Sequence, residues 1–315
     1  MPWGKELIPE VGRRIARLAR NKIFSCSGYH TRAQYRGHFA VTRSLVEGLN
    51  KIDANFNYNP RYPSGLADSV IVLAGVRTLR QAIRLKKQGR IKKLFAGPNI
   101  VIFSTDYDSI LASPEIDRVI APSDWVVDLY LEDTPSLKDR CFAWPSGVDP
   151  FYWMPDPNVR RNRILIYEKR NEGSIGQAQA HADYLEELGW SVDVLQYGSF
   201  THDQYLQKLK RSCLMIGFSM GESQGVAWAE AWAADVPTLI WKNDFNVYHG
   251  RQFKSSTAPY LRPENGLFFD DLEDFKHRFA YWEAHRQEFT PRDWTLKNMS
   301  DKVCASILYK KVTEC

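Results

Sequence analysis

The segment that decides the fold is LMIGFSMGESQGVAWAEAWAADVP, residues 214–237. Its first five residues, 214–218, are typical of a buried strand, and residues 226–234 are typical of a helix. Between them, Gly221 and Gly225 allow a ligand to approach the backbone closely, and the free N–H groups at the start of the helix favour an anion. The segment therefore predicts a strand, an anion-binding loop and a helix in that order.

The same alternation of strand and helix runs through most of the chain. The other expected strands are 70–74, 94–96, 100–103, 119–121, 164–167, 192–195 and 238–241. The other expected helices include 37–49, 125–131, 181–188 and 205–210. Gly97-Pro98-Asn99 is interpreted as a turn between two of the strands. Short apolar strands separated by helices predict parallel, doubly wound sheets.

Residues 144–162 contain four prolines and no periodicity, which is typical of a linker. The predicted fold class is therefore α/β, with two Rossmann-like domains facing across a cleft. Residues 1–150 would form an acceptor-side domain and residues 151–290 a donor domain. Residues 291–315 would form a C-terminal helix that packs back on the first domain.

Composition excludes several other classes of protein. Of the 315 residues, 44% are hydrophobic and 25% are charged, which fits a globular chain with sizeable cores. The five cysteines are far apart and form no Cys-x-x-Cys pair, so neither a disulfide framework nor a zinc site is expected. We find no signal peptide and no apolar run long enough to span a membrane, and we therefore expect a cytoplasmic protein.

Positive charge is concentrated in the first third of the chain. Residues 1–93 hold 19 basic and 5 acidic side chains, a net charge of +14. Eight cations between Arg77 and Lys93 have no acid among them and lie beside Leu79 and Ile83 in an expected helix. Three interpretations of these cations are open: a solvated helix face, a peripheral contact with an anionic inner membrane surface, or a site for an acidic or lipid-linked acceptor. Nucleic acid is not an expected partner, because no DNA- or RNA-binding motif accompanies the charge.

The decisive segment also carries a recognisable pattern, Ser219-x-x-Glu222-x-x-Gly225-x4-Glu230-Ala-x-Ala-x3-Pro237. It resembles the donor-nucleotide motif of retaining glycosyltransferases of the GT-B fold, especially family 4, including the Glu-x7-Glu spacing. The resemblance covers roughly residues 100–275 and is strongest in 214–240. It implies a nucleotide-sugar donor. The alternative is an amphipathic helix with two solvated glutamates.

The resemblance assigns roles to both glutamates. Glu222 would lie beside the donor sugar as a catalytic residue, and Glu230 would accept hydrogen bonds from the ribose hydroxyls. The remaining donor-binding residues of the loop would be Ser223, Gln224 and Gly225. Two positions depart from the family pattern, since Ser223 and Asp235 replace glycines. Aspartate tolerates a left-handed helix end better than most residues, so we expect the turn at Asp235 to form.

Two further segments fit the same family. Residues 146–149, Ser-Gly-Val-Asp, resemble the Asn-Gly-Val-Asp segment that closes the N-terminal domain. Lys169 and Arg170 follow the expected strand 164–167 and occupy the place of the pair that binds the donor pyrophosphate. Two cations at a strand end suit a leaving group whose negative charge grows as the glycosidic bond breaks. The alternative for both is a solvated turn.

Candidates in the N-terminal half are fewer. Residues 25–30 resemble the glycine-bearing loop after the first strand, which makes Gly28 a donor-binding candidate. His30, Arg32 and Arg36 are candidates for acceptor or phosphate binding. Where the family has a histidine near the reacting sugar, this chain has none, and Asp106 is the nearest polar substitute and the second catalytic candidate.

Asp106-Tyr107-Asp108 also has the Asp-x-Asp form with which the other glycosyltransferase fold, GT-A, binds a divalent metal. We favour GT-B, which implies no cofactor and no divalent metal, since the nucleotide sugar is a substrate. The expected activity is sugar transfer to an acceptor hydroxyl of a glycan or lipid-linked acceptor, with retention of configuration. The alternatives are a nucleotide-sugar 2-epimerase of the same fold and a non-catalytic sugar-nucleotide-binding protein.

Overall fold

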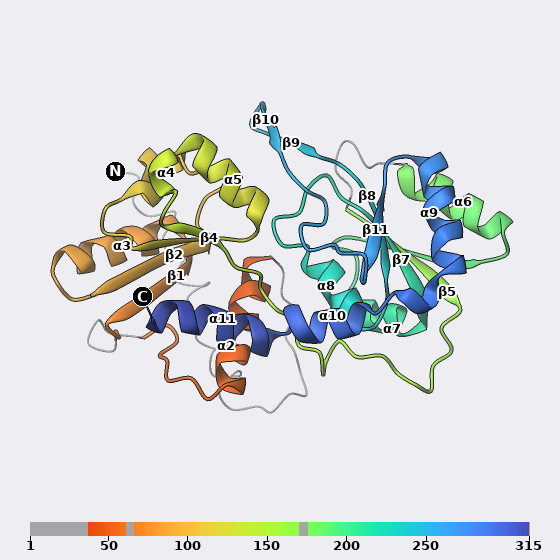
Figure 1. Ribbon diagram of the computed structural model, residues 1–315, viewed down its shortest axis with the longest axis horizontal. Coiled ribbons are helices and arrows are strands. Elements are labelled where there is room, and N and C mark those ends of the chain that lie inside the picture. Colours follow the sequence, from red (N-terminus) through yellow and green to blue (C-terminus); the bar gives the residue numbers. More distant parts are fainter. Residues whose placement is uncertain (1–36, 61–65, 170–175, 315) are drawn as a thin grey trace, which may run out of the picture. The chain divides into compact units, whose positions relative to one another are not determined.

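The structure, a computed structural model, describes residues 37–60, 66–169 and 176–314. Four parallel strands form the first sheet in the order β1-β2-β3-β4 (Figure 1). These strands are β1 (Ser69–Ala74), β2 (Lys93–Asn99), β3 (Arg118–Ala121) and β4 (Cys141–Ala143). The helices of this part of the chain are α2 (His38–Lys51), α3 (Val76–Lys87), α4 (Asp106–Ser109) and α5 (Asp124–Asp133).

Five parallel strands form the second sheet in the order β11-β8-β7-β5-β6. These strands are β5 (Arg163–Glu168), β6 (Ser191–Gln196), β7 (Ser212–Phe218), β8 (Thr238–Trp241) and β11 (Gly266–Phe269). The helices that follow them are α6 (Gln177–Glu187), α7 (His202–Arg211), α8 (Val226–Ala233) and α9 (Leu272–Ala284). An antiparallel hairpin, β9 (Phe245–Tyr248) and β10 (Arg251–Lys254), interrupts the alternation.

Parallel strands alternate with helices in both sheets, which confirms the predicted α/β class with two Rossmann-like domains. In the second sheet the chain runs from β5 outward to β6 and then returns to β7 on the other side of β5. This reversal makes the gap between β5 and β7 the switch point of the sheet. Ligands of open α/β sheets bind outside the carboxyl ends of the strands at such a point. The limits expected for the domains stay a prediction.

The centre of the second sheet explains why residues 214–218 are so apolar. All of them are buried, since a central parallel strand is covered on both faces. A Cβ on Gly217 would lie 2.6 Å from Ile240 Cδ1 and 2.7 Å from the Trp228 ring, so only glycine fits there. Trp228 and Trp232 are fully buried, and their indole N–H groups donate to the Thr257 carbonyl and the Thr238 hydroxyl.

The turn predicted at Gly97-Pro98-Asn99 is wrong. Strand β2 continues through all three residues, and residues 100–103 form no strand. A Cβ on Gly97 would lie 1.9 Å from the Ile120 carbonyl oxygen of β3. This glycine therefore marks a close approach of two backbones within the sheet, which is the other common reason for glycine in a strand.

Several elements of the second half were not predicted from the sequence. They are the β9–β10 hairpin, strand β11 and helix α9, together with the division of the C-terminal segment into α10 (Pro291–Asn298) and α11 (Asp301–Thr313). No helix among the described residues is both long and apolar enough to span a bilayer.

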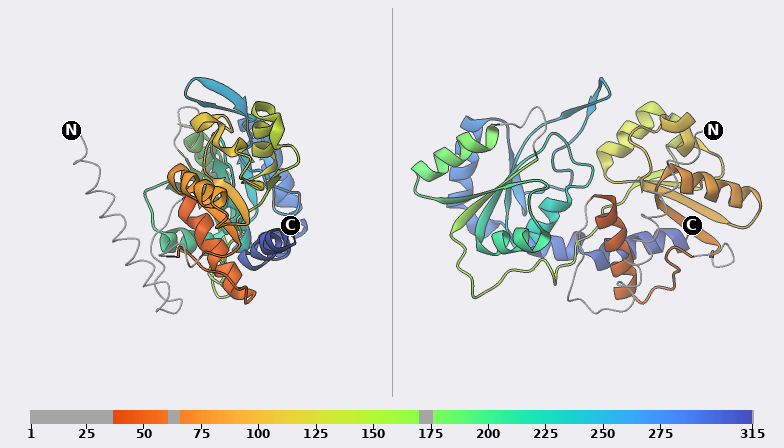
Figure 2. Two further views of the ribbon diagram at one scale, coloured as in Figure 1. Left: turned by 90° about the vertical axis from the view of Figure 1, so that its left-hand side faces the viewer. Right: turned by 180° about the vertical axis from the view of Figure 1, so that it is seen from behind.

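Helix α11 packs against α2, far from it in sequence (Figures 1 and 2). Gly48 permits the contact, because a Cβ there would lie 2.2 Å from the Asp301 carbonyl oxygen. The segment that leaves β4 passes the start of α11, where Val148 N–H donates to the Met299 carbonyl and Asp301 N–H donates to the Val148 carbonyl, both at 2.9 Å. The segment around Val148, which leads from the first sheet to the second, is thus hydrogen-bonded to the segment around residues 299–301, which leads back.

The basic helix α3 is exposed only on its charged side. Leu79 is fully buried and Ile83 packs against the core of the first sheet. The apolar stripe of α3 packs on its own sheet, so Leu79 and Ile83 are not available to a bilayer, and membrane contact through the cations stays a prediction. Arg80, Arg84 and Lys87 are exposed. Three cations pair with acids: Lys86 with Asp117, Lys87 with Glu115 and Lys92 with Asp68.

Candidate functional site

The loop between β7 and α8, residues 219–225, lies at the switch point of the second sheet and is called the donor loop below. It ends at Gly225, whose φ of +66° lies in the left-handed region that glycine adopts most readily. Helix α8 begins at the next residue and ends near Asp235, whose φ is +60°. The left-handed turn predicted at Asp235 is confirmed.

Glu222 is held by two contacts of its side chain and two of its backbone. Its carboxylate forms an ion pair with Lys169, which follows β5, and accepts a hydrogen bond of 2.8 Å from the Ser219 hydroxyl. Its backbone N–H donates to the Ser256 carbonyl at 2.8 Å, and its own carbonyl accepts from the Trp125 indole N–H at 3.1 Å. The structure thus brings the carboxyl ends of β5 and β7 together through one charged pair.

Neither glutamate of the Glu-x7-Glu spacing is solvated. Glu222 is 8% exposed and Glu230 is 5% exposed, so the alternative of an amphipathic helix with two solvated glutamates is wrong. Glu230 lies in the second turn of α8. Burial, and after it the negative charge of Glu230, raises the pKa of Tyr205, whose hydroxyl donates to the Ala227 carbonyl. The role of Glu230 in binding the donor ribose stays a prediction.

Gln224 ties the donor loop to residues 146–149. Its side-chain oxygen accepts from the Ser146 N–H at 3.0 Å, and its amide nitrogen donates to the Trp144 carbonyl at 3.3 Å. Both contacts are buried. The two segments of family resemblance, although 78 residues apart, are therefore in direct contact. Ser223, next to Gln224, is exposed.

Lys169 also contacts an aromatic side chain at the same edge of the sheet. Its ammonium lies 5.1 Å from the centre of the Tyr197 ring, and Tyr197 follows β6. Its backbone N–H donates to the Phe218 carbonyl at 2.9 Å, which extends the pairing of β5 with β7. One cation is therefore fixed at the switch point, and its role as a pyrophosphate ligand stays a prediction. Five other predicted site residues lie outside the described residues: Gly28, His30, Arg32, Arg36 and Arg170.

Asp106 has a local structural role. Its carboxylate accepts hydrogen bonds from the N–H groups of Phe103 at 2.9 Å and Ile102 at 3.2 Å, and so it orders the turn that leads into α4. Tyr107 and Asp108 follow with φ values of +54° and +62°. Its proposed catalytic role and the Asp-x-Asp metal alternative both stay predictions.

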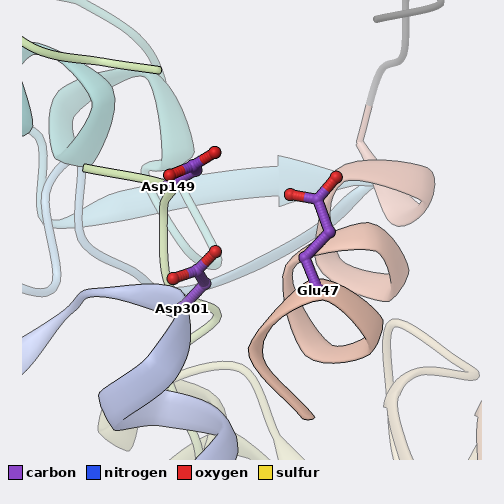
Figure 3. Close-up of side chains that lie close together, drawn as sticks. All are labelled: Glu47, Asp149 and Asp301. Atoms are coloured by element: carbon purple, nitrogen blue, oxygen red, sulfur yellow. The ribbon is translucent and has the colours of Figure 1, made fainter. Parts of the chain in front are cut away.

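A cluster of carboxylates lies between α2, residue 149 and the start of α11 (Figure 3). Oxygens of Glu47, Asp149 and Asp301 lie within 4.8 Å of one another. The ammonium of Lys51 pairs with Asp301 at 2.5 Å and with Asp149 at 3.1 Å. Burial works against this charge, but the hydrogen bond to Asp301 and the neighbouring carboxylates raise the pKa of Lys51. The cluster is an ion-pair network that joins α2 to α11.

Sequence patterns do not indicate Trp125 and Ser256 as partners of Glu222. They lie 97 residues before it and 34 residues after it, and neither belongs to a motif. The only local signal is the position of Trp125 directly after the helix start Pro122-Ser123-Asp124. Such contacts follow from the packing of two sheets and leave no spacing to detect.

No family model matches the chain, and no curated protein matches its sequence. Its fold is shared by solved structures. The apo form of the lipopolysaccharide outer core galactosyltransferase WaaB is 14% identical, with a TM-score of 0.50, over 87% of this chain and 80% of that chain. WaaG, a glycosyltransferase involved in lipopolysaccharide biosynthesis, is 10% identical, with a TM-score of 0.51, over 91% of this chain and 99% of that chain.

Sucrose-phosphate synthase from Thermosynechococcus elongatus is 12% identical, with a TM-score of 0.51, over 78% of this chain and 74% of that chain. At such identities the likeness shows the fold. The two Rossmann-like domains of the GT-B fold, which the sequence resemblance implied, are confirmed.

Proposed function

We propose that the protein is a glycosyltransferase that moves a sugar from a nucleotide-sugar donor to an acceptor hydroxyl with retention of configuration. The observation that carries the proposal is the pairing of Lys169 with Glu222 at the switch point of the second sheet, directly before the start of α8. A cation, a buried carboxylate and a helix N-terminus together suit a ligand with a diphosphate beside a polyhydroxylated sugar. The shared fold of three solved glycosyltransferases or synthases supports it.

In this proposal the residues divide the donor between them. Lys169 and Arg170 bind the pyrophosphate, Glu222 lies beside the sugar, and Glu230 accepts from the ribose hydroxyls. The bond between the anomeric carbon and the phosphate oxygen breaks, and the acceptor oxygen attacks from the same face. The acceptor proton passes to a donor phosphate oxygen, and the nucleoside diphosphate leaves. Because negative charge develops on that diphosphate, the cations stabilise the transition state more than the ground state.

Donor binding then requires an exchange of partners. In the free protein Lys169 neutralises Glu222. A diphosphate that draws the ammonium towards itself leaves the Glu222 carboxylate free to meet the sugar. One ion pair is thereby replaced by two contacts with the ligand.

The proposed acceptor is a glycan or a lipid-linked molecule bound on the side of the first sheet. The exposed cations Arg80, Arg84 and Lys87 of α3 support contact with an anionic acceptor or an anionic bilayer surface. Co-sedimentation with vesicles, with and without anionic lipid and at low and high salt, tests the membrane version. Binding that ignores both lipid charge and salt would contradict it.

The proposal is tested first by nucleotide binding. A thermal-shift screen with UDP, GDP, ADP, CMP and their sugars identifies the donor, and calorimetry measures its affinity. Glu230→Ala should weaken that affinity by about 1–3 kcal/mol, which is the cost of a lost charge-assisted hydrogen bond. Glu186→Ala is the matched control, because Glu186 is an exposed glutamate on α6. Equal affinities in both folded variants would contradict the assignment of Glu230.

Turnover separates the alternatives. Transfer that needs an acceptor supports the glycosyltransferase, whereas interconversion of the donor without an acceptor would indicate a 2-epimerase. Tight nucleotide binding with neither reaction would indicate a non-catalytic binding protein. Activity should persist in excess EDTA, since no divalent metal is part of the proposal; loss that Mn²⁺ or Mg²⁺ restores would favour the Asp106-Tyr107-Asp108 metal alternative.

A further inference from the structure

The β9–β10 hairpin is hydrogen-bonded to the donor loop on both of its sides. Before the hairpin, the Asn243 side-chain amide donates to the Met220 carbonyl at 2.7 Å. After it, the Ser256 carbonyl accepts from the Glu222 N–H at 2.8 Å. A Cβ on Gly221 would lie 2.7 Å from the Asn246 side chain, so the loop and the hairpin also pack tightly. A displacement of the hairpin would therefore move the donor loop.

Strand β10 of the hairpin contacts helix α5 and Phe103, which precedes α4. Phe253 on β10 is 9% exposed and packs edge-to-face on Phe103, with ring centres 5.3 Å apart. The two guanidinium nitrogens of Arg251 donate to both carboxylate oxygens of Asp133, at 2.8 and 2.6 Å, and its guanidinium lies 4.3 Å from the centre of the Phe103 ring. Bidentate pairing and the stacked aromatic ring fix the strand in both distance and orientation.

Trp125 joins these two sets of contacts. Its ring stacks on Phe253, with centres 6.2 Å apart and planes 21° from parallel, while its indole N–H donates to the Glu222 carbonyl. Glu222 is therefore held by two hydrogen bonds, one from its N–H to Ser256 after the hairpin and one to its carbonyl from Trp125 of α5. The two holding elements also contact each other, because Phe253 of β10 stacks on Trp125.

We propose that Trp125 and Arg251 are positioning residues for Glu222, and that the donor loop takes its ordered form only while the hairpin is docked on α5. The role of Glu222 beside the donor sugar rests on the proposed function, whereas the contacts of Trp125 and Arg251 do not depend on it. Its consequence is that a group beside the donor sugar is aligned through contacts with α5, which belongs to the acceptor side of the protein. Alignment and docking of the two parts are thus one event.

Hydrogen exchange of the donor loop tests the inference without any substrate. Arg251→Gln removes the bidentate pair, and Trp125→Phe keeps a ring on Phe253 but removes the N–H group. Each should speed exchange of the backbone amides in residues 219–225 by about tenfold, the effect of losing one hydrogen bond that restrains the loop. Lys254→Gln is the matched control, because it removes an exposed cation from the same strand. Exchange within twofold of wild type in both variants would overturn the proposal.

Kinetics add a measurement that a general loss of stability would not reproduce. Both variants should lower kcat about tenfold, because alignment is lost, while nucleoside diphosphate affinity stays within twofold of wild type. An equal fall in kcat and in nucleotide affinity would overturn the positioning role. If wild type shows no turnover, the proposed function fails, but the exchange experiment still decides whether the hairpin orders the loop. Asp133→Asn provides a second variant of the same pair if Arg251→Gln does not fold.

Discussion

Replacement of Lys51 by methionine tests how α2 is held to α11. The Lys51 ammonium lies 2.5 Å from an oxygen of Asp301, whose side chain is 1% exposed, and the lysine side chain itself is 17% exposed. Removing one partner of a buried pair leaves the other charge without compensation, which costs about 3–5 kcal/mol. Because Lys51 keeps some exposure, we expect Lys51→Met to lower the free energy of unfolding by about 3 kcal/mol, the lower end of that range.

The loss of unfolding free energy in Lys51→Met should be larger at neutral pH than at low pH. Burial raises the pKa of Asp301, and the hydrogen bond and charge of Lys51 act against this rise. Without Lys51 the pKa of Asp301 rises further, so the folded variant binds a proton that the unfolded chain releases above about pH 4. The Lys51→Met variant therefore keeps its stability at low pH and loses stability as the pH rises towards the pKa of Asp301 in the folded variant. The difference between wild type and variant should be largest near neutral pH and should shrink towards about pH 4.

Urea denaturation across this pH range measures both effects. Lys302→Met is the control, since Lys302 is an exposed lysine next to Asp301. It should change the free energy of unfolding by less than about 0.5 kcal/mol. A Lys51→Met variant that loses less than about 1 kcal/mol at neutral pH, or that loses the same amount at every pH, would refute the reasoning.

Three further predictions concern the second sheet and the donor site. Gly217→Ala should destabilise the fold by about 1–3 kcal/mol in urea denaturation, because the added methyl meets Ile240 and Trp228; no change would contradict the packing. Burial lowers the pKa of His181, so stability should be lost as the pH falls below about 6.5, and His181→Phe should remove this dependence in melting experiments. Arg170→Ala should lower kcat more than nucleotide affinity; an unchanged kcat would remove Arg170 from the mechanism.

The central strands β5, β7 and β8 of the second sheet were predictable from the sequence because they are buried on both faces. Strand β8 was expected at 238–241 and spans Thr238–Trp241, since a short apolar run between polar residues is typical of a buried strand. The β9–β10 hairpin was missed for the opposite reason. Phe245, Val247 and Tyr248 are all exposed, so no buried face imposes a pattern on the strand.

The same contrast holds at the candidate site. That Lys169 and Glu222 lie near each other could be anticipated, because both follow strands whose carboxyl ends meet at one edge of a sheet, but the ion pair between them was not predicted. The contacts of Glu222 with Trp125 and Ser256 could not, since they depend on which side chains of a separate sheet and hairpin come to lie beside it. A glycine within an apolar run fits either a turn or a close approach of two strands, and at Gly97 the close approach is the correct interpretation.

The hydrogen bonds of Val148 with Met299 and Asp301 determine what would happen to fragments of the protein. A peptide bond cut within residues 154–160 would leave α11 in the second fragment, where its apolar side still packs on α2 of the first. The indole N–H of Trp144 would still donate to the Cys304 carbonyl across the break. The two pieces would therefore reassemble without a covalent bond, and this largely exposed stretch is a natural place to split the protein or to give it new chain ends.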